Sequence, residues 1–232
     1  RPWGGTEYLS FQESGSAVWK KSVRGPLEGA GTWSQQFADP HNTACSMDQL
    51  VCGPLGILWF GEPGPRGMVE RHAGAQAPVA RDGRLFIQGE NMITAVDAFN
   101  GTLLWQRAIP GAVRVLVKAD SGNLVVTETG LYVAALDKCF RFDPATGETL
   151  RVYALPPSES DTRRRWGYVS VFGNVLYGSA ATAMKNEYGA YVASFLADGQ
   201  WRAIEEVPAE LKADYEKLKR QYPDPRGLQM LA

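Results

Sequence analysis

Side chains that carry oxygen gather in one short stretch near the start of the chain. Asp39, Asn42 and Asp48 lie close together in the sequence. Carboxylate and amide oxygens are the ligands that calcium takes, which makes this stretch the candidate metal site of the sequence. Their spacing is not that of a known calcium loop, and Asp and Asn side chains also cap turns by accepting hydrogen bonds from nearby backbone amides. We favour the capping interpretation and keep calcium binding as the alternative.

Three further residues are candidates for binding. Trp33 opens the same stretch, and Arg71 and His72 form a basic pair further along the chain. The pair could hold an anion, and a histidine can carry a proton near neutral pH. A surface pair that bonds to loop atoms is the favoured interpretation. The run 163–165, three arginines among Ser, Asp and Thr, is expected to be a solvated loop.

The spacing of the cysteines matches no redox or metal-binding motif. Cys45, Cys52 and Cys139 form no Cys-x-x-Cys, no haem-attachment motif and no adjacent pair. Because their number is odd, at least one thiol stays unpaired within the chain. A bridge from Cys45 to Cys52 would close a short loop and is kept as an alternative. Cys45 could instead be reactive, but nothing beside it in the sequence would activate a thiolate, so we favour a structural role.

The composition limits the class of protein. The chain has 232 residues, of which 44% are hydrophobic and 21% charged, and its net charge is −1. These values are typical of a soluble globular protein and give no sign of nucleic-acid binding. No run of apolar residues is long enough to predict a transmembrane helix. The chain starts with Arg1 rather than Met, so we expect residue 1 not to be the natural start.

A repeat provides the elements that would position these residues. Two segments 46 residues apart, 93–105 and 139–151, align without gaps. In both, an Asp lies four residues before a Gly, and apolar residues alternate on either side. This pattern predicts a β-hairpin, because the Gly allows a positive φ and the Asp accepts hydrogen bonds from amides of the turn. The repeated turn residues are Asp97, Gly101, Asp143 and Gly147.

Further predicted strands precede each hairpin, at 83–89, 123–127 and 131–135. Three or four short antiparallel strands in a period of this length are typical of a propeller blade. We therefore predict an all-β fold, a β-propeller of four-stranded antiparallel blades. A propeller closes with about four to eight blades, whereas the sequence shows two clear blades, one degenerate blade and one partial blade. We expect a fragment of a ring, completed by further blades from the same or another chain.

Four regions divide the chain. We expect 1–24 to end a preceding blade, 25–77 to form a long Gly/Pro-rich insertion, 78–205 to form consecutive blades and 206–232 to form a helical extension. The extension contains one predicted surface helix, at 208–221. Its apolar face carries Leu211, Tyr215 and Leu218, and two prolines follow it.

The hairpins resemble the repeat of the pyrroloquinoline-quinone-type, or quinoprotein-type, propellers, which reads Ala-x-Asp-x-x-Thr-Gly-x-x-x-Trp. The first copy matches from Ala95 to Trp105, with Asn100 in place of Thr. The second copy keeps the Asp, Thr and Gly but ends on Arg151. In that family the Trp stacks across the gap to the next blade and ties the ring together. The resemblance implies this role for Trp105.

A second resemblance covers most of the chain. The runs around Trp33 and Trp59 and the pair at 71–72 are similar to uncharacterised exported proteins of planctomycete-type bacteria that carry this propeller. In those proteins Thr-His follows the Trp, whereas Ser34 and Gln35 follow it here, so any role of that His is absent. Such proteins are longer than this chain, in agreement with a fragment. The resemblance implies an extracytoplasmic location, periplasmic or secreted.

The resemblance also sets the functional alternatives. Quinone dehydrogenases of this fold hold pyrroloquinoline quinone with a stacking Trp and a disulfide between adjacent cysteines, and they use calcium and a catalytic Asp. This sequence has no adjacent cysteines, and no Asp fits the catalytic motif. We therefore expect a non-catalytic binding or scaffold module, as in the propeller lipoprotein of the outer-membrane barrel-assembly machinery, with a protein or envelope-polymer partner and no cofactor. The alternatives are one part of a periplasmic quinoprotein oxidoreductase and a structural subunit of a larger assembly.

Overall fold

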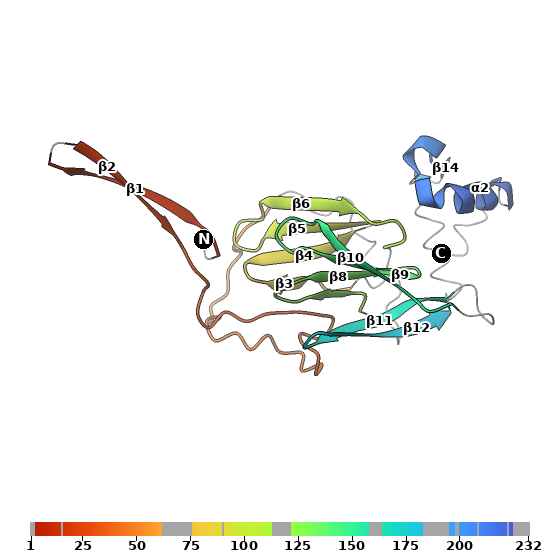
Figure 1. Cartoon of the computed structure of the whole chain (residues 1–232), viewed down its shortest axis with the longest axis horizontal. Coiled ribbons are helices and arrows are strands. Elements are labelled where there is room, and N and C mark those ends of the chain that lie inside the picture. The colour runs from red at the N-terminus through yellow and green to blue at the C-terminus, as the bar shows by residue number, and fades with distance from the viewer. Residues whose placement is uncertain are drawn as a thin grey trace.

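Two four-stranded antiparallel sheets form the centre of the computed structural model (Figure 1). The structure describes residues 3–14, 16–61, 76–89, 91–112, 122–157, 164–182, 195–197, 200–207, 209–221 and 223–224. Blade 1 contains β3 (Val79–Arg81), β4 (Arg84–Gly89), β5 (Met92–Asp97) and β6 (Leu103–Ala108). Blade 2 contains β7 (Leu124–Val126), β8 (Leu131–Ala135), β9 (Lys138–Phe142) and β10 (Thr149–Ala154). In both sheets each strand pairs with the next along the chain, so the predicted propeller blade is confirmed.

Three smaller strand pairs accompany the two blades. Blade 3 is described as β11 (Arg164–Phe172) paired with β12 (Val175–Thr182). The chain begins with a hairpin of β1 (Thr6–Glu13) and β2 (Ser16–Val23), which projects away from the blades (Figure 1). β13 (Leu196–Ala197) and β14 (Gln200–Trp201) form the third pair. No helix in the described part of the chain is long and apolar enough to cross a membrane.

The alternation of side chains along a strand explains the apolar run of β8. Leu131 and Val133 belong to the core between blades 1 and 2, whereas Tyr132 and Ala134 belong to the core shared with blade 3. Successive side chains point to opposite faces of a sheet, and both faces of blade 2 are covered. All five residues of β8 are therefore buried, whereas the outermost strand β10 is largely exposed.

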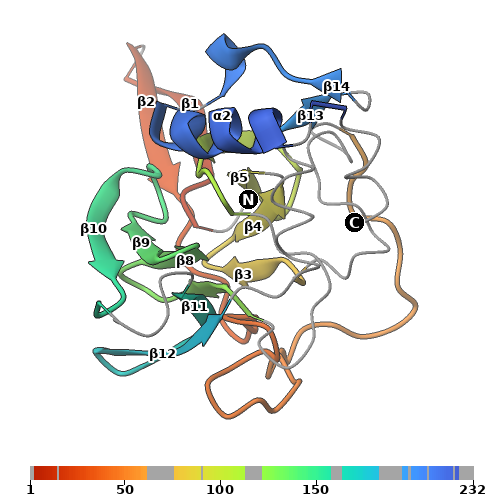
Figure 2. The same ribbon diagram turned by 90° about the vertical axis from the view of Figure 1, so that its right-hand side faces the viewer.

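The C-terminal region forms the predicted helix, although it begins later than expected. Two 3₁₀ turns, Ile204–Glu206 and Ala209–Leu211, precede α2 (Lys212–Gln221). The predicted apolar face packs inward, because Leu211, Tyr215 and Leu218 are buried against Phe195 and Val207. Figure 2 shows α2 beside β13 and β14, away from β11 and β12. The helix is thus held by a satellite core of its own.

The predicted insertion contains no strand among its described residues 25–61. Two isolated bridges are its only β pairing there, Trp33 with Ala80 and Gln35 with Ala38. Several of its residues have positive φ, among them Ala38, Asn42 and Ala44. The segment is therefore an irregular chain that is held by specific contacts to the blades.

Candidate functional site

The first strands of the three blades converge. β3 contacts β7, and β11 contacts β7 and β8. In a propeller the blades surround a central axis, so strands that converge in this way line it. These edges are where a channel ligand would bind.

One segment of the insertion lies along these edges. Trp33 exchanges two backbone hydrogen bonds with Ala80 of β3, at 2.9 and 2.8 Å. The amide of Val126 in β7 donates to the carbonyl of Ser34 at 2.8 Å. We call residues 33–38 the axial segment. It pairs with the inner edges of blades 1 and 2 and so satisfies backbone groups that would otherwise be unpaired.

Gln35 connects the axial segment to blade 3. Its side chain is fully buried. Nε2 donates to the Tyr168 hydroxyl and to the Asp39 carbonyl, both at 2.9 Å. Oε1 accepts from the Ser170 hydroxyl at 3.0 Å. A buried amide with its hydrogen-bonding groups paired in this way fixes the relative position of the segment and β11.

The two candidate metal-binding carboxylates cap turns. Asp39 accepts hydrogen bonds from the amides of His41 and Thr43, at 2.8 and 3.3 Å, and from the Thr43 hydroxyl. The hydroxyl contact holds the pKa of Asp39 below its usual value. Asp48 accepts from the amides of Gly31, Leu50 and Val51 at 2.7–2.8 Å, and these bonds, that of Gly31 foremost, lower its pKa.

Each of the three predicted ligands has hydrogen-bond partners of its own. Asn42 uses its Oδ1 to accept a hydrogen bond from Tyr168 at 3.2 Å. No group of three His, Cys, Asp or Glu side chains suited to a metal ion occurs in the described residues. The carboxylates that could bind calcium are engaged with amides of their own turns, so the donor set present does not fit a calcium–quinone centre.

The structure describes some of the remaining candidate residues and not others. Trp33 lies in the axial segment, and its indole Nε1 is buried with no hydrogen-bond partner in the described structure. Arg71 and His72 lie outside the described residues. Cys45 and Cys52 are exposed free thiols. Burial in the core raises the pKa of Cys139 to about 12, which suits a structural cysteine.

The repeated turns have closely similar geometry in the two blades. Gly101 and Gly147 have φ of +71° and +70°, which favours glycine. In each turn the Gly amide donates to the carbonyl of the preceding Asp. Asp97 accepts from Phe99 at 2.9 Å, and Asp143 accepts from Ala145 and Thr146 at 2.7 and 2.8 Å. The bond from Thr146 lowers the pKa of Asp143 most strongly.

Trp105 links blade 1 to blade 2 through the second of these turns. Its Nε1 donates to the carbonyl of Pro144 at 3.1 Å. A Cβ on Gly147 would lie only 2.7 Å from the indole ring. The indole therefore packs directly against a turn in which a side chain at position 147 would overlap the ring, and this contact joins blade 1 to blade 2.

Trp59 makes the same contact one period earlier. Its Nε1 donates to the carbonyl of Ala98 at 2.9 Å, and a Cβ on Gly101 would lie 2.5 Å from its ring. In the sequence, Trp59 was placed only in a run that is similar to exported propeller proteins, and no contact of its own was predicted for it. The signal that could have identified it is its position 46 residues before Trp105.

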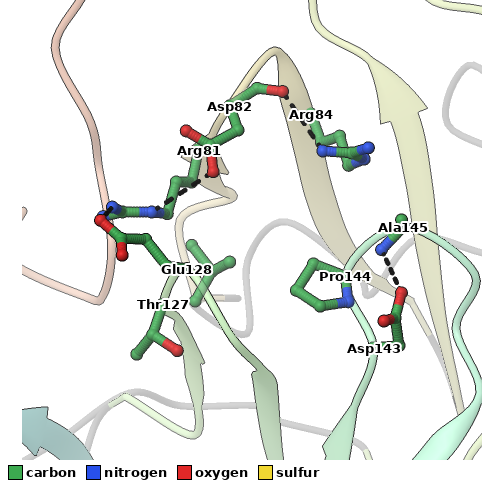
Figure 3. A pocket seen from close by; sticks show the side chains of 9 residues that line it. Arg81, Asp82, Arg84, Thr127, Glu128, Asp143, Pro144 and Ala145 are labelled. Carbon is green, nitrogen blue, oxygen red and sulfur yellow. Dashed lines mark hydrogen bonds and ion pairs between the residues drawn. The ribbon is translucent and has the colours of Figure 1, made fainter. Parts of the chain in front are cut away.

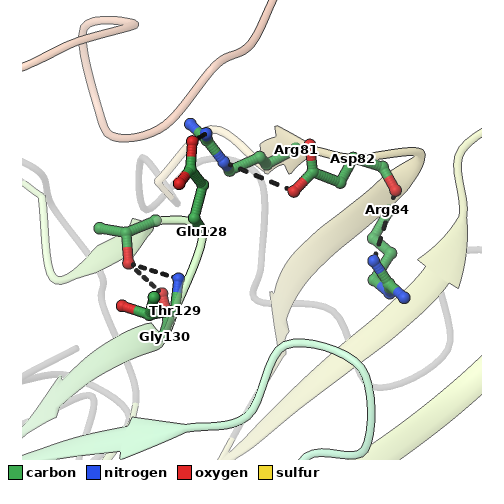
Figure 4. Close-up of polar contacts among 7 residues, drawn as sticks. Arg81, Asp82, Arg84, Glu128, Thr129 and Gly130 are labelled. Atoms are coloured by element: carbon green, nitrogen blue, oxygen red, sulfur yellow. Dashed lines mark hydrogen bonds and ion pairs between the residues drawn. The ribbon is translucent and has the colours of Figure 1, made fainter. Parts of the chain in front are cut away.

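A small cleft opens between blades 1 and 2 beside these turns (Figure 3). It has a volume of about 120 Å³. Arg81 pairs with Glu128 at 2.7 Å and approaches Asp82 at 3.6 Å (Figure 4). The lining residues are Arg81, Asp82, Arg84, Val126, Thr127, Glu128, Asp143, Pro144 and Ala145.

Charged and polar side chains make up most of the lining of the cleft. Arg84 makes one long hydrogen bond, 3.4 Å, to the carbonyl of Asp82, and its charge helps to lower the pKa of Asp143. The lining includes no His or Cys. The Arg81–Glu128 pair joins blade 1 to blade 2 beside the cleft, so it contributes to the contact between these blades.

Comparisons with known proteins agree with this architecture. A family model described as outer membrane protein assembly factor BamB matches residues 9–225. Compared with curated protein sequences, the chain has no significant match.

Several solved structures are similar to parts of the chain. Quinohemoprotein alcohol dehydrogenase ADHIIG from Pseudomonas putida HK5 is 16% identical with a TM-score of 0.48, covering 66% of this chain and 23% of its own. BamB from Moraxella catarrhalis is 16% identical with a TM-score of 0.35, covering 47% of this chain and 36% of its own. The chain thus spans well under half the length of these structures. Since the family model covers most of the sequence, the chain belongs to the BamB family of quinoprotein-like, pyrroloquinoline-quinone-type repeat β-propellers.

Proposed function

We propose that the chain is a non-catalytic binding and scaffold module of an exported bacterial protein. The observation that carries the proposal is the axial segment. A small cofactor at the axis would require the inner blade edges to be accessible, whereas here the chain itself pairs with β3 and β7 and inserts the buried Gln35 beside β11.

Exposed apolar side chains supply the binding surface. Among the described residues, most of the large hydrophobic side chains that face solvent belong to the first 60 residues, including Trp19, Met47, Leu55 and Phe60. Contiguous exposed apolar groups mark interaction sites more often than isolated ones do. The family description, an outer membrane protein assembly factor, supports a protein partner and a location outside the cytoplasm.

Cofactor titration tests the non-catalytic part of the proposal. The purified chain is titrated with pyrroloquinoline quinone and Ca²⁺, while absorbance and dye-linked alcohol oxidation are followed. We expect no saturable absorbance change and no oxidation above the level without protein. Stoichiometric quinone binding with turnover would contradict the proposal and favour the oxidoreductase alternative.

Site-specific photo-crosslinking in bacterial envelope extracts tests the binding part. A photoreactive residue at Met47, which lies outside residues 53–60, should capture a protein partner, whereas the same group at Leu150 on the outer strand of blade 2 should not. Leu150 is a matched control because it is also apolar and exposed. Equal capture at both positions would argue against a specific binding surface.

A further inference from the structure

The segment around Trp59 occupies the place of an outermost strand. Trp59 contacts the turn of blade 1 in the way that Trp105, from the outermost strand β6, contacts the turn of blade 2. The two Trp residues are 46 residues apart, the period of the repeat. Residues 57–60 therefore correspond in the repeat to the first part of β6. They contact the turn of blade 1, as β6 contacts the turn of blade 2.

This segment lacks the neighbour that β6 has. β6 pairs with β5 along its length, whereas the backbone of residues 53–60 makes no hydrogen bond to any described part of the chain. Its apolar side chains are open to solvent, with Ile57 88% and Phe60 98% exposed. Unpaired amides beside exposed apolar side chains form a template for an added strand. We call residues 53–60 the open edge.

The N-terminal hairpin is a strand donor in the same chain. β1 and β2 pair with each other over eight residues, and no other described strand pairs with either. Tyr8, Leu9 and Trp19 are exposed on it, and Trp19 lies four residues after Gly15, the spacing of Trp105 after Gly101. A two-stranded hairpin alone is marginally stable in water, whereas a third strand makes a sheet that can persist.

The base of the hairpin is anchored on blade 1, while its strands project away from the blades. At its base Trp3 stacks on Phe99 of the blade 1 turn, with 5.9 Å between ring centroids, and donates to the Gly25 carbonyl at 2.9 Å. From this base the strands project away from the blades (Figure 1). Since Trp59 docks on the same turn, base and open edge are held close together while the strands point outward.

We propose that the open edge is paired by the β1–β2 hairpin of a second copy of this chain. Each copy carries one donor and one acceptor, so reciprocal exchange closes a two-fold dimer. Residues 53–60 contain no charged side chain, so the charges of the hairpin, such as Lys20 and Glu7, meet no like charge there. The proposal concerns self-association and holds whether or not the axis binds a cofactor.

Analytical ultracentrifugation of the whole chain over a wide concentration range tests the proposal. We expect a species of twice the 25.4 kDa chain mass that dissociates on dilution. Lysine on a strand edge opposes pairing, so Ile57→Lys in the acceptor and Leu9→Lys in the donor should each weaken the dimer by at least about tenfold. Leu150→Lys, on the exposed β10, should leave it unchanged.

Two further measurements separate strand exchange from other dimers. Hydrogen exchange at the amides of residues 57–60 should slow as the concentration rises, because these amides gain partners. A mixture of the Ile57→Lys and Leu9→Lys chains should form a mixed dimer better than either forms alone, since one intact contact remains. The proposal is overturned if the wild-type chain stays monomeric, if both lysine variants dimerise as tightly as Leu150→Lys, or if the mixture gains nothing. Unchanged far-UV circular dichroism confirms that each variant is folded.

Discussion

Trp105 and Trp59 dock on the same kind of turn, yet they belong to very different surroundings. Trp105 lies on a strand that is paired with β5, and only 7% of it is exposed. Trp59 lies on a segment that pairs with no described strand, and the residues on either side of it face solvent. The docking contact is therefore local to one Trp and one turn. Whether it joins two complete blades depends on the strands behind it.

Removal of the Trp side chain should give the largest difference between the two regions. Trp105→Ala loses the packing against the Gly147 turn and opens a cavity in the core between blades 1 and 2, so we expect a loss of about 3–5 kcal/mol in the free energy of unfolding. Trp59→Ala removes a half-buried ring from an open edge and should cost clearly less. Urea unfolding measures both. Equal losses would show that the open edge is as well packed as blade 1.

Glycine substitution in the turn should have the next largest effect. Gly147→Ala places a Cβ 2.7 Å from the Trp105 ring at a φ of +70°, and strain together with overpacking should cost about 2–4 kcal/mol. Gly173→Ala is the matched control, because its φ is +58° but no atom lies within 4 Å of the added Cβ. The control should cost about 1–2 kcal/mol. If both variants lose the same amount, the contact with Trp105 contributes nothing beyond backbone strain.

The turns could be predicted from the sequence, whereas the axial segment could not. Asp143 and Gly147 act within a few residues of each other, so their spacing contains the information. Gln35 acts on Tyr168 and Ser170, which lie 133 and 135 residues away in the sequence, and no local pattern indicates such a contact. Trp59 is an intermediate case, because it keeps the period but Val51 and Leu55 stand where the repeat has Asp and Gly.

The candidate metal site also shows what the sequence could not predict. The clustering of Asp39, Asn42 and Asp48 was visible in the sequence, but the direction of each side chain was not. Each carboxylate turns back onto amides of its own loop, so the cluster stabilises the insertion that carries the axial segment. Its proposed role is structural, and calcium binding there is the competing hypothesis.

Substitution of Gln35 should sharpen the contrast between the axial segment and the open edge. Gln35→Ala leaves the buried Ser170 hydroxyl without its partner and removes one of the two hydrogen bonds of the half-buried Tyr168 hydroxyl, so we expect a loss of about 1–3 kcal/mol in the free energy of unfolding. Gln12→Ala, on the exposed hairpin, is the control and should change stability little. Hydrogen exchange of β11 should become faster only in the first variant. Unchanged exchange there would mean that the axial segment is not held through this side chain.

Acidification should have the smallest effect, and it acts on the loop that carries the axial segment. The pKa values of Asp39 and Asp48 lie below their ordinary values in the folded chain because both carboxylates accept hydrogen bonds. A depressed folded-state pKa contributes stability above the unfolded-state pKa of about 3.9, and this contribution is lost as the pH falls through the folded-state value. The melting temperature should therefore decline on acidification from pH 5 to pH 3, and Asp48→Asn should flatten the decline.

Added Ca²⁺ should leave the melting temperature of both the wild-type chain and Asp48→Asn unchanged, because the carboxylate oxygens already accept hydrogen bonds from backbone amides. A calcium-dependent rise in the melting temperature that Asp48→Asn abolishes would instead establish the loop as a metal site.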